Sequence, residues 1–255
     1  MKKLINYCIF ALFTLISFYV TEKTAVLLRN QDPLMENIKT YKESYDISPV
    51  NATIIDNYII PGVSGQEIDE VKSLIKMREN SLFNELLIVT NQVMPEISLV
   101  DNLDKIIVKG NSQKKMVSII LESDRLINYF KDNKIEVSVL VDNNNFESVK
   151  YGELINNDYL NYKDVEKKLN NAKRNNNLCI INNNIEDICR KNNKYLVQVN
   201  KMLDNTNYIE VKNNLESGDI ILISDNTSYE YINLLIKYIN SKNLKIVFLS
   251  KLIAE

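Results

Sequence analysis

The stretch MVSIILESD, residues 116–124, decides the fold predicted for this chain. Its apolar, β-forming residues predict a buried strand, and that strand ends abruptly in acidic and hydroxyl side chains. Folds built from parallel strands and helices place functional side chains at the carboxyl ends of their buried strands. We therefore expect a parallel sheet whose functional site lies at the end of this strand, with Glu122 as its first candidate residue.

The pattern of this stretch repeats to the end of the chain. Further strands are predicted at residues 136–141, 178–181, 195–199, 219–223 and 245–249. Helices are predicted between them at residues 125–132, 146–154, 163–173, 185–191, 209–215 and 229–241. Strands that alternate with helices imply an α/β fold with a mostly parallel sheet, either open or closed into a barrel.

The chain before this region has a different character. All four prolines precede residue 96, and residues 51–60 alternate apolar with polar side chains before a turn at 61–65. We predict a small α+β module over residues 51–112, preceded by a stalk over residues 23–50. The larger α/β domain then occupies residues 113–255.

The N-terminal segment predicts a membrane helix. Lys2 and Lys3 precede an uncharged, mostly apolar run of about 17 residues from Leu4 to Val20. Positive charges at its start predict an N-terminus inside the cell and a body outside it. We expect residues 1–22 to be a single-pass anchor in the cell membrane, with a cleaved signal as the alternative, and the body to be extracytoplasmic.

Composition excludes several classes of function. Histidine is absent, which removes the commonest zinc ligand and the usual acid or base near neutral pH. A net charge of −2 gives no electrostatic reason to expect nucleic acid as a partner. Glycine-rich nucleotide-binding motifs are missing, so we expect no nucleotide either.

Two cysteines, Cys179 and Cys189, follow the membrane run. The first falls on a predicted strand and the second on the next predicted helix, so their side chains could approach closely. A disulfide would suit an exported protein, and two buried free thiols are the alternative. Both interpretations stay open on the sequence alone. A cysteine nucleophile is disfavoured because no histidine is present to activate it.

Several segments resemble the polysaccharide deacetylase (NodB-like) family, in the membrane-anchored form found in low-GC Gram-positive bacteria. The resemblance covers residues 110–255 and, before them, residues 51–55, 59–62, 97–102 and 107–111. It implies a distorted β/α barrel of the deacetylase type over residues 113–255. It also implies a divalent metal such as zinc and an acetyl-removing reaction on cell-wall polysaccharide.

The family's first two motifs are degenerate in this chain. Where the family has Phe-Asp-Asp, with a catalytic base followed by a metal ligand, this chain has Leu121, Glu122 and Ser123. The two metal-binding histidines of the second motif correspond to Asp158 and Tyr162. A serine and a tyrosine are poor ligands for a divalent ion, so we expect no bound metal cofactor and keep Glu122 as a residual base.

The remaining motifs are degenerate as well. Asn182 stands in the place of the third motif, and Ser224 replaces the acid histidine of the final motif. The residues expected to contact a glycan are Asp158, Tyr159, Tyr162, Asn182 and Asp225. Aromatic faces suit the C–H edges of sugar rings, although partly buried structural tyrosines are the alternative.

Three functions follow from this resemblance and its departures. The first is a cell-surface protein that is catalytically inactive and binds cell-wall glycan, peptidoglycan or an envelope partner. The second is an active carbohydrate deacetylase that uses Glu122 and Asp158 with a non-zinc metal or none. The third is a structural envelope scaffold. Whether the chain is an enzyme is left open, and the inactive binding protein is the function we expect.

Overall fold

The computed structural model describes residues 2–181 and 185–255 and divides the chain into two compact units. Unit 1 comprises Met1–Pro49 and Gly65–Val93, and unit 2 comprises Val50–Ser64 and Met94–Glu255. Residues 51–112, expected as one module, are thus shared between the two units. The reason is strand pairing: the hairpin of β1 (Thr53–Ile55) and β2 (Tyr58–Ile60) joins the sheet of unit 2.

Unit 1 is a small helical unit with one pair of antiparallel strands among its described residues. Its elements are α1 (Lys2–Asn30), α2 (Pro33–Tyr45), α3 (Glu70–Arg78), a short 3-10 turn (Glu85–Leu87) and the antiparallel strands β3 (Gly65–Ile68) and β4 (Thr90–Val93). Asp32 caps α2 by accepting a hydrogen bond from the Leu34 N–H, and Asp69 caps α3 in the same way. A core formed by Met35, Ile38, Ile68, Leu74 and Met77 holds these elements together.

Helix α1 is the one part of the described chain that is long and apolar enough to cross a membrane. The candidate span is Ile9–Asn30, and it is not buried by any other part of the protein. The helix continues beyond the apolar run predicted from the sequence because Glu22 and Lys23 are good helix formers. By length and composition, α1 is a candidate membrane anchor.

Unit 2 contains two sheets with mostly parallel strands. The first has the order β1-β2-β5-β10-β9, and the second has the order β11-β12-β6-β7-β8, with β13 also paired to β6. The further strands are β5 (Ile106–Ile107), β6 (Met116–Leu121), β7 (Ser138–Val141), β8 (Glu153–Asn156), β9 (Leu178–Ile180), β10 (Tyr195–Val197), β11 (Lys201–Leu203), β12 (Ile220–Ile223) and β13 (Lys245–Val247). Strand β6, the stretch that predicted the fold, lies at the centre of the second sheet.

The two sheets are joined along the chain and by a side chain. The chain passes directly from β10 in the first sheet to β11 in the second. Between β8 and β9, which are not paired as strands, the Asn176 amide donates to the Leu154 carbonyl at 2.6 Å. The predicted α/β fold with parallel strands is confirmed, and this arrangement is compatible with a distorted barrel.

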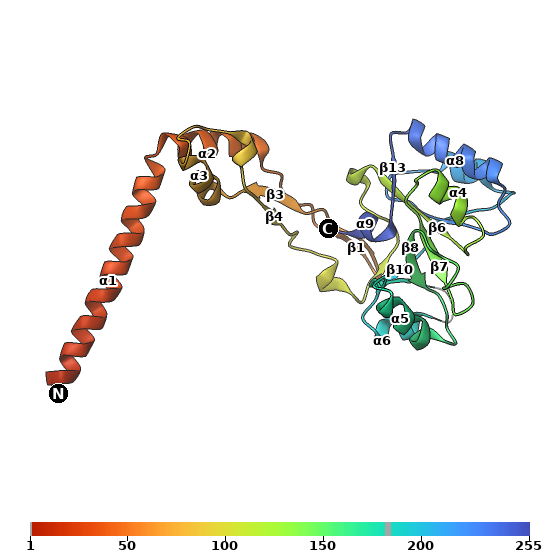
Figure 1. Ribbon diagram of the computed structural model, residues 1–255, viewed down its shortest axis with the longest axis horizontal. Helices are drawn as coiled ribbons and strands as arrows, with labels where there is room; N and C mark the ends of the chain where they lie inside the picture. The colour runs from red at the N-terminus through yellow and green to blue at the C-terminus, as the bar shows by residue number, and fades with distance from the viewer. Residues whose placement is uncertain (1, 182–184) are drawn as a thin grey trace. The chain divides into compact units, whose positions relative to one another are not determined.

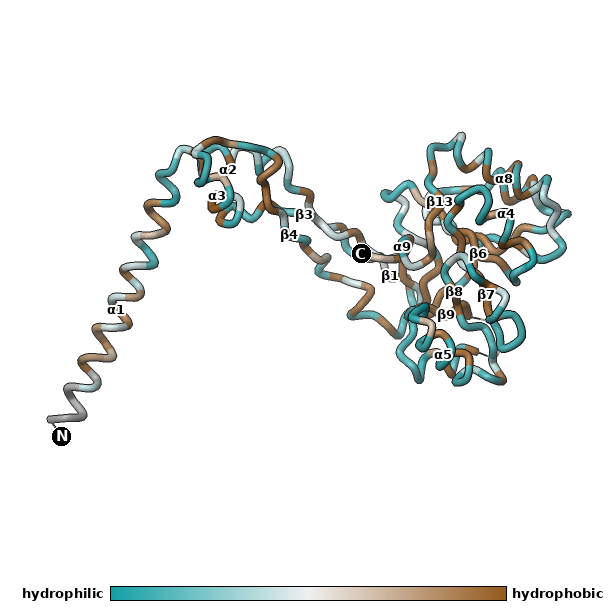
Figure 2. The backbone as a smooth tube through the Cα atoms, in the orientation of Figure 1, coloured by the Kyte–Doolittle hydropathy of each residue, from teal (hydrophilic) through white to brown (hydrophobic). Residues whose placement is uncertain are grey.

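Helices surround the strands of unit 2. They are α4 (Ile127–Asp132), α5 (Tyr162–Asn171), α6 (Glu186–Lys191), α7 (Tyr208–Asn213), α8 (Tyr229–Ser241) and α9 (Leu249–Ile253). Figure 1 shows α4 and α8 on one side of the strands and α5 and α6 on the other. In Figure 2 the hydrophobic residues of unit 2 concentrate on its central strands, and the loops around them are hydrophilic.

One predicted element is wrong. Residues 146–154, expected as a helix, form turns that lead into strand β8. Gly152 has a φ of +85°, and a Cβ at this position would lie 2.6 Å from the Val137 carbonyl oxygen. A helix cannot include that backbone conformation, so the chain turns at Gly152 and pairs with β7 instead.

Candidate functional site

The carboxyl ends of β6, β7, β8, β11 and β12 meet at one edge of the six-stranded sheet, because these strands are all parallel. We call this the carboxyl edge; it is where the sequence predicted a site. Polar side chains follow every one of these strands. The hydrogen bonds of these side chains determine which of them are directed toward solvent and which bind one another.

The loops after β6 and β12 bring four predicted residues together. Glu122 Oε2 accepts hydrogen bonds from Ser224 Oγ and from the Asp225 N–H, both at 3.0 Å. Ser123 Oγ donates to Asp225 Oδ1 at 2.6 Å. The segments predicted to correspond to the family's first and last motifs therefore lie side by side here. Their polar atoms bind one another, although Glu122 itself remains exposed.

Asp158 is used to close two loops. Its carboxylate accepts from the Asn161 N–H at 2.8 Å and from the Asn143 N–H, after β7, at 3.0 Å. The side chain is buried, which by itself would raise its pKa. The backbone donors of Asn161 and Asn143 outweigh that effect, and the pKa of Asp158 lies below its ordinary value. This ionised carboxylate serves as a loop cap.

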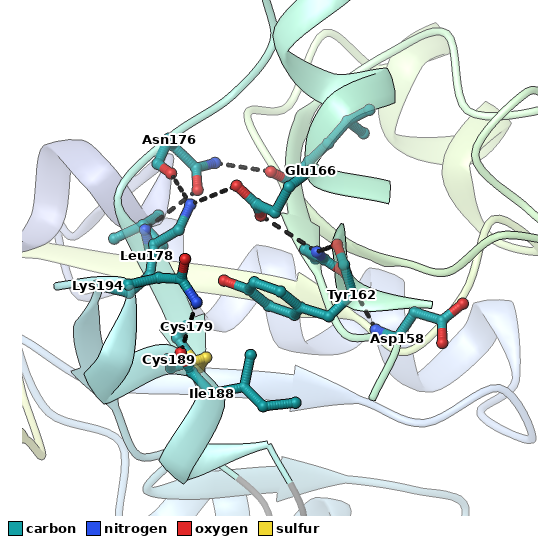
Figure 3. A network of polar contacts seen from close by, with 12 residues as sticks. Asp158, Tyr162, Glu166, Asn176, Leu178, Cys179, Ile188, Cys189 and Lys194 are labelled. Carbon is teal, nitrogen blue, oxygen red and sulfur yellow. Dashed lines mark hydrogen bonds and ion pairs between the residues drawn. A yellow bond between two sulfur atoms is a disulfide. The ribbon is translucent and has the colours of Figure 1, made fainter. Parts of the chain in front are cut away.

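Tyr162 is buried in the interior of unit 2. The sequence predicted it, with Asp158, at one of the two metal-binding positions of the family's second motif. Tyr162 is 5% exposed and belongs to a cluster with Ile106, Ile185 and Leu196. Burial, with a smaller effect from Glu166, raises its pKa. Figure 3 shows the Tyr162 ring directed toward Ile188 and Lys194, whereas the Asp158 carboxylate points the other way. The two side chains do not converge on a common point.

The same cluster contains a disulfide between Cys179 on β9 and Cys189 on α6, with a Cα–Cα distance of 6.2 Å. Of the two states that the sequence left open, the structure has the bonded one. Both residues are fully buried, so the bond fastens α6 onto the sheet from inside.

Tyr159 and Asn182 complete the predicted set. Tyr159 is 50% exposed and lines a groove formed by residues 159–164 together with Ile188, Lys191 and Asn192. Of the two tyrosines proposed to stack on sugars, Tyr159 is the one whose ring is available. Asn182 lies outside the described residues.

These positions do not fit a divalent metal. Ser123 is bonded to Asp225, the Asp158 oxygens are occupied by N–H donors, and Tyr162 faces the core. Within residues 2–181 and 185–255, no group of three or more His, Cys, Asp or Glu side chains could hold such an ion. No hydrolytic step through a metal-bound water can be derived from this geometry.

Other residues of the carboxyl edge were not singled out in the sequence. Ser148 Oγ donates to Asp124, which joins the loops after β6 and β7. Asn205, after β11, donates to the Asn226 carbonyl at 2.5 Å and joins the loops after β11 and β12. Asp124 ends the very stretch that predicted the fold, and it could have been found there. Asn205 was hidden because β11 itself was not predicted.

A buried polar network lies beside Tyr162 (Figure 3). Lys194 Nζ lies 2.9 Å from Glu166 Oε2 and donates to the Asn176 carbonyl at 2.6 Å. Glu166 Oε1 accepts from the Asn156 amide at 3.1 Å. Lys194 is 7% exposed, so this is an ion pair removed from water. The network connects the end of β8 with α5 and with the starts of β9 and β10.

Comparison with known proteins identifies the fold. No family model matches the chain. A curated relative is the uncharacterized protein YlxY of Bacillus subtilis, 28% identical over 134 residues. The match covers 47% of this chain and 42% of YlxY, so it spans less than half of that relative.

Solved structures give a longer match. A CE4 family pseudoenzyme from Bacillus anthracis aligns with a TM-score of 0.61 and 16% identity, covering 88% of this chain and 96% of its own. A mutant of that pseudoenzyme with restored enzymatic activity aligns with a TM-score of 0.59 and 16% identity, covering 87% and 98%. The chain therefore has the CE4, or polysaccharide deacetylase, fold. The predicted deacetylase-type fold is confirmed.

Proposed function

From the CE4 fold and the state of its catalytic positions, we propose that this chain is a membrane-anchored, deacetylase-like protein without deacetylase activity. Its body lies outside the cytoplasm and binds cell-wall glycan. The observation that carries the proposal is that Glu122, Ser123, Asp158 and Ser224 all bind partners within the chain. The family's reaction needs a metal-activated water, and the residues that the structure describes offer no set of ligands for such a metal.

Two features support the location. Helix α1 has the length and composition of a membrane span, and basic residues precede its apolar run. The Cys179–Cys189 disulfide fits an oxidising exterior, because the cytosol keeps thiols reduced. Both features agree with a body that is exported and held at the membrane.

The groove at Tyr159 is the proposed glycan site. It offers an exposed aromatic face beside the amine of Lys191 and the amide oxygens of Asn161 and Asn192, whose amide nitrogens donate to Asp158 and to the Ile188 carbonyl. An aromatic ring flanked by an amine donor and amide acceptors suits a sugar, whose faces are apolar and whose rim carries hydroxyl groups. Asp225 lies at the end of β12, and we assign it to the structural group around Glu122 rather than to this groove.

A paired assay tests this function. The purified full chain in detergent is mixed with acetylated chitin oligomers and with peptidoglycan, and both acetate release and retention on the insoluble glycan are measured. We expect retention without acetate release. Tyr159→Ala should lower retention about fivefold, because stacking on one ring contributes on the order of 1 kcal/mol.

Tyr229→Ala is the matched control, since Tyr229 is 52% exposed and lies outside the groove. It should bind as the wild type does. Acetate release that is abolished by Glu122→Gln or Asp158→Asn would replace this proposal with the active deacetylase. If the protein neither binds the glycan nor releases acetate, the envelope scaffold would be favoured instead.

A further inference from the structure

Unit 1 exposes large apolar side chains beside the end of α1. Leu82 is 69% exposed and Leu86 is 91% exposed, although both are leucines in an ordered loop. On neighbouring α3, Ile75 is 61% exposed and Val71 is 39% exposed. Large apolar side chains with this degree of exposure are candidates for a site of interaction.

The loop over residues 79–88 has a clear inner and outer side. Phe83, Leu87 and Ile88 pack against the core of unit 1. Leu82 and Leu86 alternate with them and point outward. The outward direction is fixed by the packing of the inner residues, and Asn84 further orders the turn by accepting from the Leu86 N–H at 2.9 Å. The leucines are therefore presented on a rigid support.

Contacts within unit 1 tie this loop to the end of the candidate membrane helix. Arg78, just before the loop, binds Asp32 through Nε at 3.3 Å and Nη2 at 3.2 Å. Asp32 lies two residues beyond Asn30, where α1 ends, and Asn30 accepts from Lys39 Nζ at 3.0 Å. A shallow pocket lined by both Asp32 and Leu82 joins the two segments.

We propose that Leu82 and Leu86 insert into the bilayer surface next to α1, so that unit 1 rests on the lipid. This inference relies on the proposed membrane anchor. If the candidate span Ile9–Asn30 crosses the bilayer, its end at Asn30 lies near the headgroups, and the 79–88 loop is held at that level by the Arg78–Asp32 contact. Apolar side chains on such a surface bury about 5–10 Å deep, at the boundary of headgroups and acyl chains.

The charges beside the leucines are mixed. Glu79 and Glu85 lie in the loop, and Lys72 and Lys76 lie on α3. The contact therefore needs no anionic lipid, and a zwitterionic bilayer is a sufficient partner.

The absence of tryptophan makes the test direct, because one introduced tryptophan is read without background from others. The full chain is reconstituted in phosphatidylcholine vesicles, with and without lipids brominated near the headgroup end of the acyl chains. Leu82→Trp and Leu86→Trp are measured beside Phe13→Trp, on α1, and Leu160→Trp, an 85% exposed leucine of unit 2. Brominated lipid should quench the tryptophan fluorescence of Leu82→Trp, Leu86→Trp and Phe13→Trp about twofold or more. The fluorescence of Leu160→Trp should be unchanged.

Each other outcome overturns the inference in a distinguishable way. Quenching of Phe13→Trp alone would retain the anchor and show that water or a protein partner covers the two leucines. An unquenched Phe13→Trp would remove the anchor and, with it, the lipid contact. Equal quenching of Leu160→Trp would show general adsorption, because tryptophan itself favours the membrane interface.

Discussion

Two polar networks of unit 2 differ in their exposure. At the carboxyl edge, Glu122 binds Ser224 and Asp225 on a surface open to water. Beside Tyr162, Lys194 and Glu166 form an ion pair in the interior. Both networks join loops or elements that are distant in sequence. Only the first lies at the carboxyl edge of the sheet.

The difference in exposure predicts a difference in how much each network stabilises the fold. Water competes for every hydrogen bond of the exposed network, so each bond adds little to stability. The buried network has no such competition, and losing one partner leaves a charge without compensation. The exposed residues could therefore be replaced at small cost, whereas the buried ones are required by the fold.

Removal of Lys194 should have the largest effect. Lys194→Ala leaves the Glu166 carboxylate partly buried without its cation, and we expect the free energy of unfolding to fall by about 3–5 kcal/mol. Urea denaturation measures it. Lys167→Ala is the control, because Lys167 lies on the exposed side of α5, the helix that carries Glu166. Its free energy of unfolding should stay within about 0.5 kcal/mol of the wild-type value. Equal losses in both variants would show that the buried pair is not special.

Removal of the disulfide should come next. Cys179→Ala combined with Cys189→Ala frees a closed loop of sequence separation 10, and we expect a loss of about 2–4 kcal/mol. The loss should be seen in oxidised protein. After reduction, the free energy of unfolding of the wild type should be much closer to that of the double variant. A wild type that is indifferent to reductant would contradict a structural bond between these residues.

Asp158 should give an intermediate, pH-dependent effect. Asp158→Asn replaces one carboxylate acceptor of a charge-assisted hydrogen bond by an amide donor, and we expect a loss of about 1–3 kcal/mol at pH 7. Because the folded pKa of Asp158 is lowered, its contribution is present above the unfolded value and is lost as the pH falls through the folded pKa. The difference in free energy of unfolding between Asp158→Asn and the wild type should therefore narrow below about pH 4. A gap that is constant down to pH 2 would contradict this cause.

The sequence predicted the architecture better than the site. Apolar strand β6 and its neighbours could be recognised because buried strands need continuous hydrophobic runs. The helix expected at 146–154 was wrong because a single glycine, Gly152, turns the chain there. Degenerate motifs at Glu122 and Asp158 were visible from the sequence. The inward direction of the Tyr162 ring was not, since it depends on packing against residues distant in the chain.

Ser224 should give the smallest effect, and it separates the two networks most sharply. Ser224→Ala removes one hydrogen bond to Glu122, which keeps the Asp225 N–H as a donor. Because the site is open to water, we expect the free energy of unfolding to change by no more than about 0.5–1 kcal/mol. Retention on glycan should be unchanged as well, since Ser224 does not line the Tyr159 groove. A loss as large as that of Lys194→Ala would show that the carboxyl edge stabilises the fold as strongly as the interior does, and the contrast between the two networks would be lost.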